Sequence, residues 1–185
     1  MLSDRILAAA RTSFASVGYA ATSLRSVARD AEVDPALVSY YFASKDKLLD
    51  SALMPPPGFL DAIAAAAGGP LRTRGAALVG AMLAIWDDPT SAAVIRAIIL
   101  TAAHEPVAMD RLRSLFGEQM LGAVADNLTG DERVLRASLV GSQIVGVAMT
   151  RYVWRVGALA TMTSSDVARL VAPSVQRYLT GKPLA

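Results

Sequence analysis

The sequence predicts an all-α protein, with a small amino-terminal three-helix domain that contains a helix-turn-helix and a larger helical domain after it. Apolar residues recur at helical spacing along most of the 185 residues, and no segment has a β-strand alternation of useful length. Two short helix patterns lie close together within residues 22–45, where neither can bury much surface alone. Pro55-Pro56-Pro57-Gly58 then stops any helix. We therefore place the domain boundary near Met54, with domains at 1–54 and 55–185.

The first helix of the amino-terminal domain is capped by Ser3 or Asp4 and ends at Gly18, a residue type that often follows the last helical turn. Its apolar stripe runs from Ile6 to Val17. Tyr19 then leads into the helix-turn-helix.

The helix-turn-helix has recognisable start signals. Thr22 and Ser23 precede the first short helix and can cap its free amides. The second short helix opens with Asp34-Pro35, an N-cap carboxylate followed by a residue that needs no amide partner. A further helix begins after Ser44 and runs to the proline segment.

The remaining chain is predicted to be a series of helices, because glycine and proline residues separate its long apolar stretches. The expected helices are 59–67, 71–87, 90–104, 107–127, 131–156 and 164–179.

Composition and charge exclude several classes of protein. The longest charge-free stretch is the 14-residue run 137–150, shorter than the roughly 20 residues of a membrane-spanning helix. With no cysteine, no disulfide scaffold is expected, so we expect a cytoplasmic protein that does not enter a membrane. No cysteine, one histidine and no glycine-rich phosphate loop argue against an enzyme, a metal site or a cofactor. Residues 1–54 carry six cationic and six acidic side chains, so nucleic-acid binding would depend on where the cations lie.

The amino-terminal motifs resemble the DNA-binding domain of TetR-type transcriptional regulators. The resemblance covers roughly residues 4–53 and rests on segments 14–19, 22–23, 27–33 and 40–45, followed by Leu48. It implies a homodimer that binds double-stranded DNA at a palindromic operator through one small domain per subunit. It also implies that the larger domain serves ligand binding and dimerisation, with an apolar small-molecule effector whose binding releases DNA, as in a repressor.

In a helix-turn-helix, the second helix enters the major groove and the first crosses the backbone. The residues expected to contact bases or phosphates are Thr22, Ser23, Arg25, Pro35, Ala36, Ser39, Tyr40, Tyr41 and Lys45. Each has an alternative role: the hydroxyls as caps, the tyrosines as packing residues, and the cations as solvated charges. The second helix begins Pro35-Ala36-Leu37, without Arg, Lys, Asn or Gln for bidentate base contacts. Base reading would then fall on Ser39, Tyr40, methyl contacts or DNA shape.

The larger domain contains methionine and aromatic residues at helical spacing, a composition suited to irregular apolar ligands. The candidate effector-binding residues are Met82, Trp86, His104, Phe116, Met120, Gln143 and Met149. The alternative is an ordinary core, with His104 serving only as a helix cap.

The last two long helices carry stripes of small and apolar residues that a second subunit could cover. The candidate dimer-interface residues are Ser138, Gly141, Ser142, Val167, Leu170, Val171 and Ser174. The alternative is that both stripes pack within one subunit. For the whole chain, the alternative function is a helical module that binds a hydrophobic small molecule and never contacts DNA.

Overall fold

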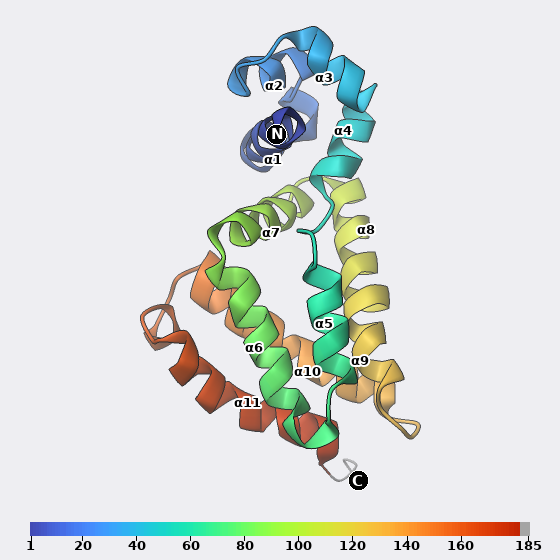
Figure 1. Ribbon diagram of the computed structural model, residues 1–185, viewed down its shortest axis with the longest axis vertical. Coiled ribbons are helices and arrows are strands. Elements are labelled where there is room, and N and C mark those ends of the chain that lie inside the picture. Colours follow the sequence, from blue (N-terminus) through green and yellow to red (C-terminus); the bar gives the residue numbers. More distant parts are fainter. Residues whose placement is uncertain (182–185) are drawn as a thin grey trace. The chain divides into compact units, whose positions relative to one another are not determined.

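The computed structural model describes residues 1–181, which form helices and no strands (Figure 1). This part of the chain divides into two compact units. Unit 1 comprises residues 1–56 and 93–113, and unit 2 comprises residues 57–92 and the described residues from 114 onwards. The predicted all-α class is confirmed. The functional division at residue 54 stays a prediction, and residues 93–113 pack with the amino-terminal segment.

Unit 1 is built from six helices. They are α1 (Leu2–Ala21), α2 (Leu24–Asp30), α3 (Pro35–Phe42), α4 (Lys45–Ala52), most of α7 (Pro89–Ala102) and α8 (Pro106–Ser114) up to Arg113. The largest fully buried side chains of its core are Phe14, Ile6, Leu48, Val27 and Val38, and Ile98 from α7 belongs to the same core. The hydrophobic core of unit 1 therefore includes residues from both chain segments.

Helix α1 differs in part from the sequence prediction. Its N-cap is Met1 rather than Ser3 or Asp4, and Asp4 instead accepts a hydrogen bond from the amino-terminal ammonium at 2.8 Å. Gly18, the predicted end of this helix, has a positive φ of 80° and kinks it. The helical assignment continues beyond it to Ala21.

Unit 2 is arranged around α6 (Arg74–Asp87), which packs closely against α11 (Ser164–Thr180). The other elements are α5 (Phe59–Gly68), η1 (Leu71–Thr73), η2 (Leu115–Leu121), α9 (Gly122–Asp126), α10 (Arg133–Ala148), η3 (Met149–Val153) and η4 (Ala158–Ala160). A Cβ at Gly75 would lie only 2.7 Å from the backbone nitrogen of Gln176. The α6–α11 approach therefore requires a glycine at this position.

A buried cation joins three elements of unit 2. The guanidinium of Arg74 donates to the carbonyl oxygen of Gly69 at 2.8 Å and to that of Asn127 at 2.6 Å. These carbonyls follow the ends of α5 and α9, where helix geometry leaves acceptors without partners. Arg74 thus connects the start of α6 to two helix ends.

Two of the predicted long helices contain π-helical segments. The helix predicted over 107–127 is π-helical at η2, and the one predicted over 131–156 ends as an α-helix at Ala148 and continues as η3. Such segments frequently lie at functional sites.

A membrane-spanning helix must be both long and apolar. Within residues 1–181 no single helix is both long and apolar enough to cross a membrane. Only 71–87 and 89–102, taken together as a bent pair, meet those requirements.

Candidate nucleic-acid interface

Helix α3 is held in place at both ends. Asp34 accepts a hydrogen bond from the amide of Ala36 at 2.7 Å, and Pro35 occupies the first helical position. Val38 is fully buried, and Phe42, four residues on, packs against the same core. The predicted start and inward face of α3 agree with the structure.

The turn before α3 and the junction after it contain unusual backbone conformations. Glu32 in the turn has φ of 52°, and Ala43 between α3 and α4 has φ of 55° and ψ of −40°. Residues other than glycine rarely adopt a positive φ, and strain of this kind tends to occur at functional sites. Ser44 then caps α4 by accepting from the amide of Lys47 at 3.2 Å.

The outward face of α3 is small, polar and aromatic. Pro35, Ala36 and Ser39 are all exposed, and Tyr40 is 81% exposed. Tyr41 meets Tyr40 edge to face, with ring centroids 5.5 Å apart. The five candidate DNA contacts on α3 are thus all open to solvent.

Thr22 requires a correction. Its side chain is buried, and its hydroxyl donates to the carbonyl of Gly18 at 2.8 Å and lies 2.9 Å from the hydroxyl of Ser13. A buried hydroxyl that already has partners inside the protein is not available to a DNA phosphate. The side chain of Thr22 therefore links the start of α2 to α1 and is not exposed for a contact with DNA.

Ser23 and Arg25 remain at the surface. Ser23 is the N-cap of α2 and accepts from the amide of Ser26 at 3.0 Å, while the hydroxyl of Ser26 accepts from the amide of Ser23 at 2.9 Å. This reciprocal pair is a capping box, in which Ser26 has a role that the sequence prediction missed. Arg25 is exposed, and within residues 1–181 its guanidinium has no hydrogen bond or ion pair.

Lys45 is held against α1. Its ammonium lies 4.1 Å from the centroid of the Tyr19 ring and 3.4 Å from the carbonyl oxygen of Ala20. The hydroxyl of Tyr19 donates to Asp46, and this hydrogen bond is the main cause that raises the pKa of Tyr19. The sequence prediction singled out Lys45 but missed the partners that position it.

The predicted effector residues are divided between the two units. His104 is exposed in unit 1, after the end of α7, whereas the other six belong to unit 2. Met82 and Trp86 are buried on α6, and the rest are half-buried. Phe116 and Met120 lie in η2, Gln143 lies on α10 and Met149 lies in η3. Because α10 packs against both α6 and η2, the elements that carry these six residues are neighbours.

The predicted dimer residues also need a correction. Val167 is fully buried within unit 2, and Gly141 is buried where a Cβ would lie 2.4 Å from the side chain of Leu121. Both belong to the interior of the single chain. Ser138 and Ser142 are exposed on α10, Leu170 is exposed on α11, and Val171 and Ser174 are half-buried there.

Helix α2, a tight turn and the capped helix α3, which we call the reading helix, form the arrangement that defines the helix-turn-helix class of DNA-binding proteins. Residues 6–52 match the family model for bacterial regulatory proteins of the tetR family, and residues 73–179 match the tetracyclin repressor-like C-terminal domain. The chain belongs to the TetR family of DNA-binding transcriptional regulators.

Solved structures support the same assignment. A TetR-family regulator from Streptomyces coelicolor is 37% identical, with a TM-score of 0.62 over 96% of this chain and 94% of that chain. Two others show the same fold. NalD, the secondary repressor of the MexAB-OprM multidrug efflux pump in Pseudomonas aeruginosa, has 16% identity and a TM-score of 0.68 over 98% and 96%. PfmR from Thermus thermophilus has 19% identity and a TM-score of 0.65 over 96% and 100%. No curated protein matches the chain.

Proposed function

We propose that this regulator is a repressor, that it binds a palindromic operator as a homodimer, and that an apolar small molecule bound in unit 2 releases it. The observation that carries the proposal is that the exposed large apolar side chains of unit 2 are concentrated on α10, α11 and the segment between them, which we take as the proposed face. Two symmetry-related copies of α3 would read two halves of an operator, so a two-fold protein implies a two-fold site.

The proposed face accounts for most of the exposed apolar residues in unit 2. In the described residues of unit 2, the exposed large hydrophobic side chains are Leu71, Val134, Leu135, Trp154, Val156 and Leu170. All except Leu71 lie on α10, on α11 or between them. Contiguous exposed apolar surface is a common mark of a protein–protein interface, and symmetric dimers are the commonest soluble oligomers.

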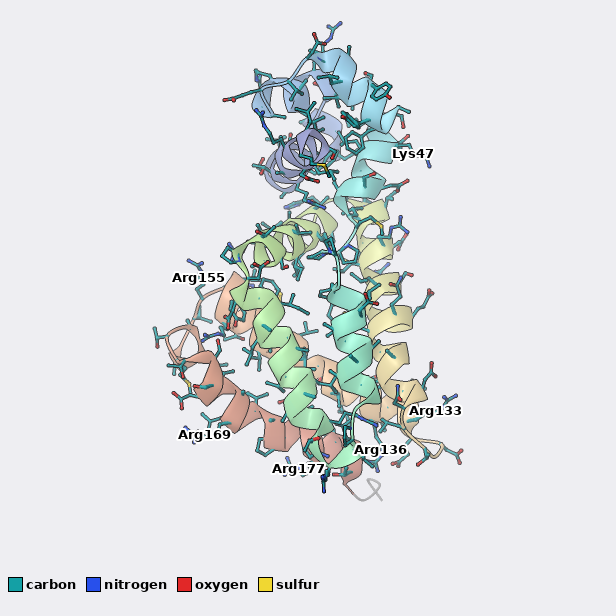
Figure 2. The ribbon with its side chains drawn as sticks, in the orientation of Figure 1. Lys47, Arg133, Arg136, Arg155, Arg169 and Arg177 are labelled. Carbon is teal, nitrogen blue, oxygen red and sulfur yellow. The ribbon has the colours of Figure 1, made fainter. Side chains whose placement is uncertain are left out.

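The charges near this face support contact between identical copies. Figure 2 labels arginines of α10, α11 and the intervening segment, and Arg155 and Arg169 project outwards. Arg169 pairs with Asp166 at 2.9 Å, and Arg133 pairs with Asp126 at 3.4 Å. This pairing reduces the repulsion between like-charged surfaces.

The effector half of the proposal is supported by the helical irregularities of unit 2. Phe116, Met120 and Met149, three of the six candidates in this unit, lie in the π-helical segments η2 and η3. Trp86 stacks on Tyr152 of η3, with ring centroids 5.2 Å apart. An apolar ligand between α6 and these segments would therefore contact adaptable methionine and aromatic side chains.

The dimer is tested by Leu170→Glu, with Leu71→Glu as the matched control. Both leucines are about half exposed in unit 2, Leu170 at 55% and Leu71 at 46%, but only Leu170 lies on α10, α11 or the segment between them. Sedimentation should show a dimer for the wild type and the Leu71 variant and a monomer for the Leu170 variant. A monomeric wild type at micromolar concentration would contradict the dimer.

The DNA and effector steps are tested by selecting genomic DNA fragments that the protein binds and then screening apolar compounds for release of those fragments.

The position of the effector is tested by tryptophan fluorescence. Trp154→Phe leaves Trp86 as the only tryptophan, because the chain has two. A releasing compound should change the fluorescence of that variant at the same concentration that frees the DNA. Release without any fluorescence change would place the effector away from α6. Selected fragments without two-fold symmetry would contradict the palindromic operator.

A further inference from the structure

We propose that unit 2 contains a second ligand site, for an apolar monocarboxylate such as a medium-chain fatty acid, between the start of α10 and the end of α11. The site is separate from the candidate effector residues, because none of them lines it. Binding at this site requires neither a dimer nor an operator, so it can be tested independently of the proposed function.

The site is a cavity of about 380 Å³, and Figure 2 labels its two arginines, Arg136 of α10 and Arg177 of α11. Small-molecule sites generally have volumes of about 300–1,000 Å³ and mostly apolar walls with a few polar groups. Leu135 and Leu139, one helical turn apart on α10, provide apolar wall, and Glu132 is the third charged residue of the lining. The size and the lining of the cavity are therefore those of a small-molecule site.

Arg136 is already occupied by partners within the protein. Its guanidinium donates to the carbonyl oxygens of Tyr178 at 2.9 Å and Gly181 at 2.7 Å, and to Glu132 at 3.2 Å. Carbonyl groups at the end of a helix have no partner in the helix and carry partial negative charge, which would repel an anion. Because Arg136 binds these two carbonyls and Glu132 balances its charge, this cluster does not oppose an anionic ligand.

Arg177 provides the free positive charge of the cavity. Its side chain is exposed, and within residues 1–181 its guanidinium has no hydrogen bond or ion pair. The lining thus carries two guanidinium groups and one carboxylate, a net charge of +1 that matches a single negative charge. One guanidinium can donate two parallel hydrogen bonds to a carboxylate. The apolar part of the ligand would then cover Leu135 and Leu139, and removing this surface from water favours binding.

The matched test is Arg177→Gln against Arg155→Gln, with octanoate as the probe and octanol as its uncharged counterpart. Arg155 is also exposed in unit 2 and without a partner in the described residues, but it does not line the cavity. Calorimetry on the full-length protein should show one octanoate bound per wild-type subunit. Arg177→Gln should weaken this binding about tenfold or more, because the paired charge is lost. Arg155→Gln should bind octanoate as the wild type does, and octanol should not distinguish the three proteins.

Several results would overturn the proposal. Octanoate could fail to bind the wild type, or bind it and Arg177→Gln equally. A change in Trp86 fluorescence when octanoate is added to Trp154→Phe would place the probe among the effector residues. Failure of the dimer to bind octanoate, together with weaker dimerisation of Arg177→Gln, would show that a second copy fills the cavity. Thermal unfolding is the folding check, and Arg177→Gln should unfold with the wild type because its guanidinium has no partner in the described residues.

Discussion

Thr22 illustrates what decides the role of a single residue in the helix-turn-helix. Its place before α2 made it a candidate for both a cap and a phosphate contact, and the sequence could not distinguish these from a buried anchor. The hydroxyl contacts Ser13 and Gly18 of the preceding helix, so the role of Thr22 depends on how α1 and α2 pack against each other. Ser23, one residue later, has the predicted capping role because capping depends only on local chain geometry.

Replacing Thr22 by valine should therefore destabilise the protein without removing a DNA contact. The change leaves the hydroxyl of Ser13 and the carbonyl of Gly18 without their partner, at a cost of about 1–3 kcal/mol. Urea unfolding should show this loss, while the salt slope of DNA binding stays at the wild-type value. Thr22→Ser, which keeps the hydroxyl, is the control. A slope lowered by one in the valine variant would restore Thr22 as a phosphate contact.

Tyr19 gives unit 1 a predictable response to alkaline pH. The hydrogen bond to Asp46 raises the pKa of Tyr19 because it requires the neutral phenol, and desolvation adds to the shift. A raised pKa stabilises the folded state below the unfolded value of about 10, and the contribution is lost as the pH rises through the folded value. The sequence showed Tyr19 only as a residue between helices.

We expect Tyr19→Phe to be less stable than the wild type at neutral pH and to approach it above a pH of about 10. Phenylalanine keeps an aromatic ring beneath Lys45, so the comparison isolates the hydroxyl. Urea unfolding of both proteins at neutral and alkaline pH measures the difference. A gap that stays constant across this range would show that the hydrogen bond is not the cause.

At the scale of whole helices, local signals located the starts of elements better than their internal geometry. Asp34-Pro35 and Ser44 begin α3 and α4 as predicted, because caps and proline act within a few residues. The π-helical turns of η2 and η3 could not be predicted, because apolar spacing over 107–127 and 131–156 also fits a regular helix. The sequence placed Gly141 and Val167 in a candidate dimer interface for a similar reason. Periodicity identifies an apolar face but not the element that covers it.

The α6–α11 contact provides a prediction at this scale, with Gly75→Ala and Gly80→Ala as a matched pair on one helix. The Cβ at position 75 would meet the backbone of Gln176 and Ala172, whereas the one at position 80 has nothing within 4 Å. Gly75→Ala should destabilise the protein by about 1–3 kcal/mol through overpacking. Gly80→Ala should stabilise it by roughly 0.5–1 kcal/mol, since alanine favours a helix. Thermal unfolding distinguishes them, and equal shifts in the same direction would contradict the close approach.

Across the whole molecule, the two compact units are not consecutive stretches of the chain. The proline segment marked the end of the first packed stretch, yet residues 93–113 return to the same core. Nothing in their sequence indicated this, because an apolar helix can be covered by any neighbour. The consequence is that unit 1 depends on residues far along the chain from its reading helix.

Ile98→Ala should therefore weaken the core of unit 1 even though Ile98 lies far along the chain from α1–α4. Ile98 is buried in that core, while Leu100 on the same helix is exposed, so Leu100→Ala is the control. We expect a loss of about 2–5 kcal/mol for Ile98→Ala and little change for Leu100→Ala. Hydrogen exchange of α1–α4 amides should rise in the first variant alone. Unchanged exchange there would mean that 1–56 is stable by itself.

Ala43 joins α3 to α4 with a backbone that suits glycine better than alanine. Glycine at this position would relax the junction, but it would also free the reading helix to pivot. Ala43→Gly should therefore raise the thermal stability of the protein and lower its affinity for the operator. A laboratory selection for thermal tolerance alone should recover variants that carry Ala43→Gly, and these variants should bind DNA more weakly than the wild type.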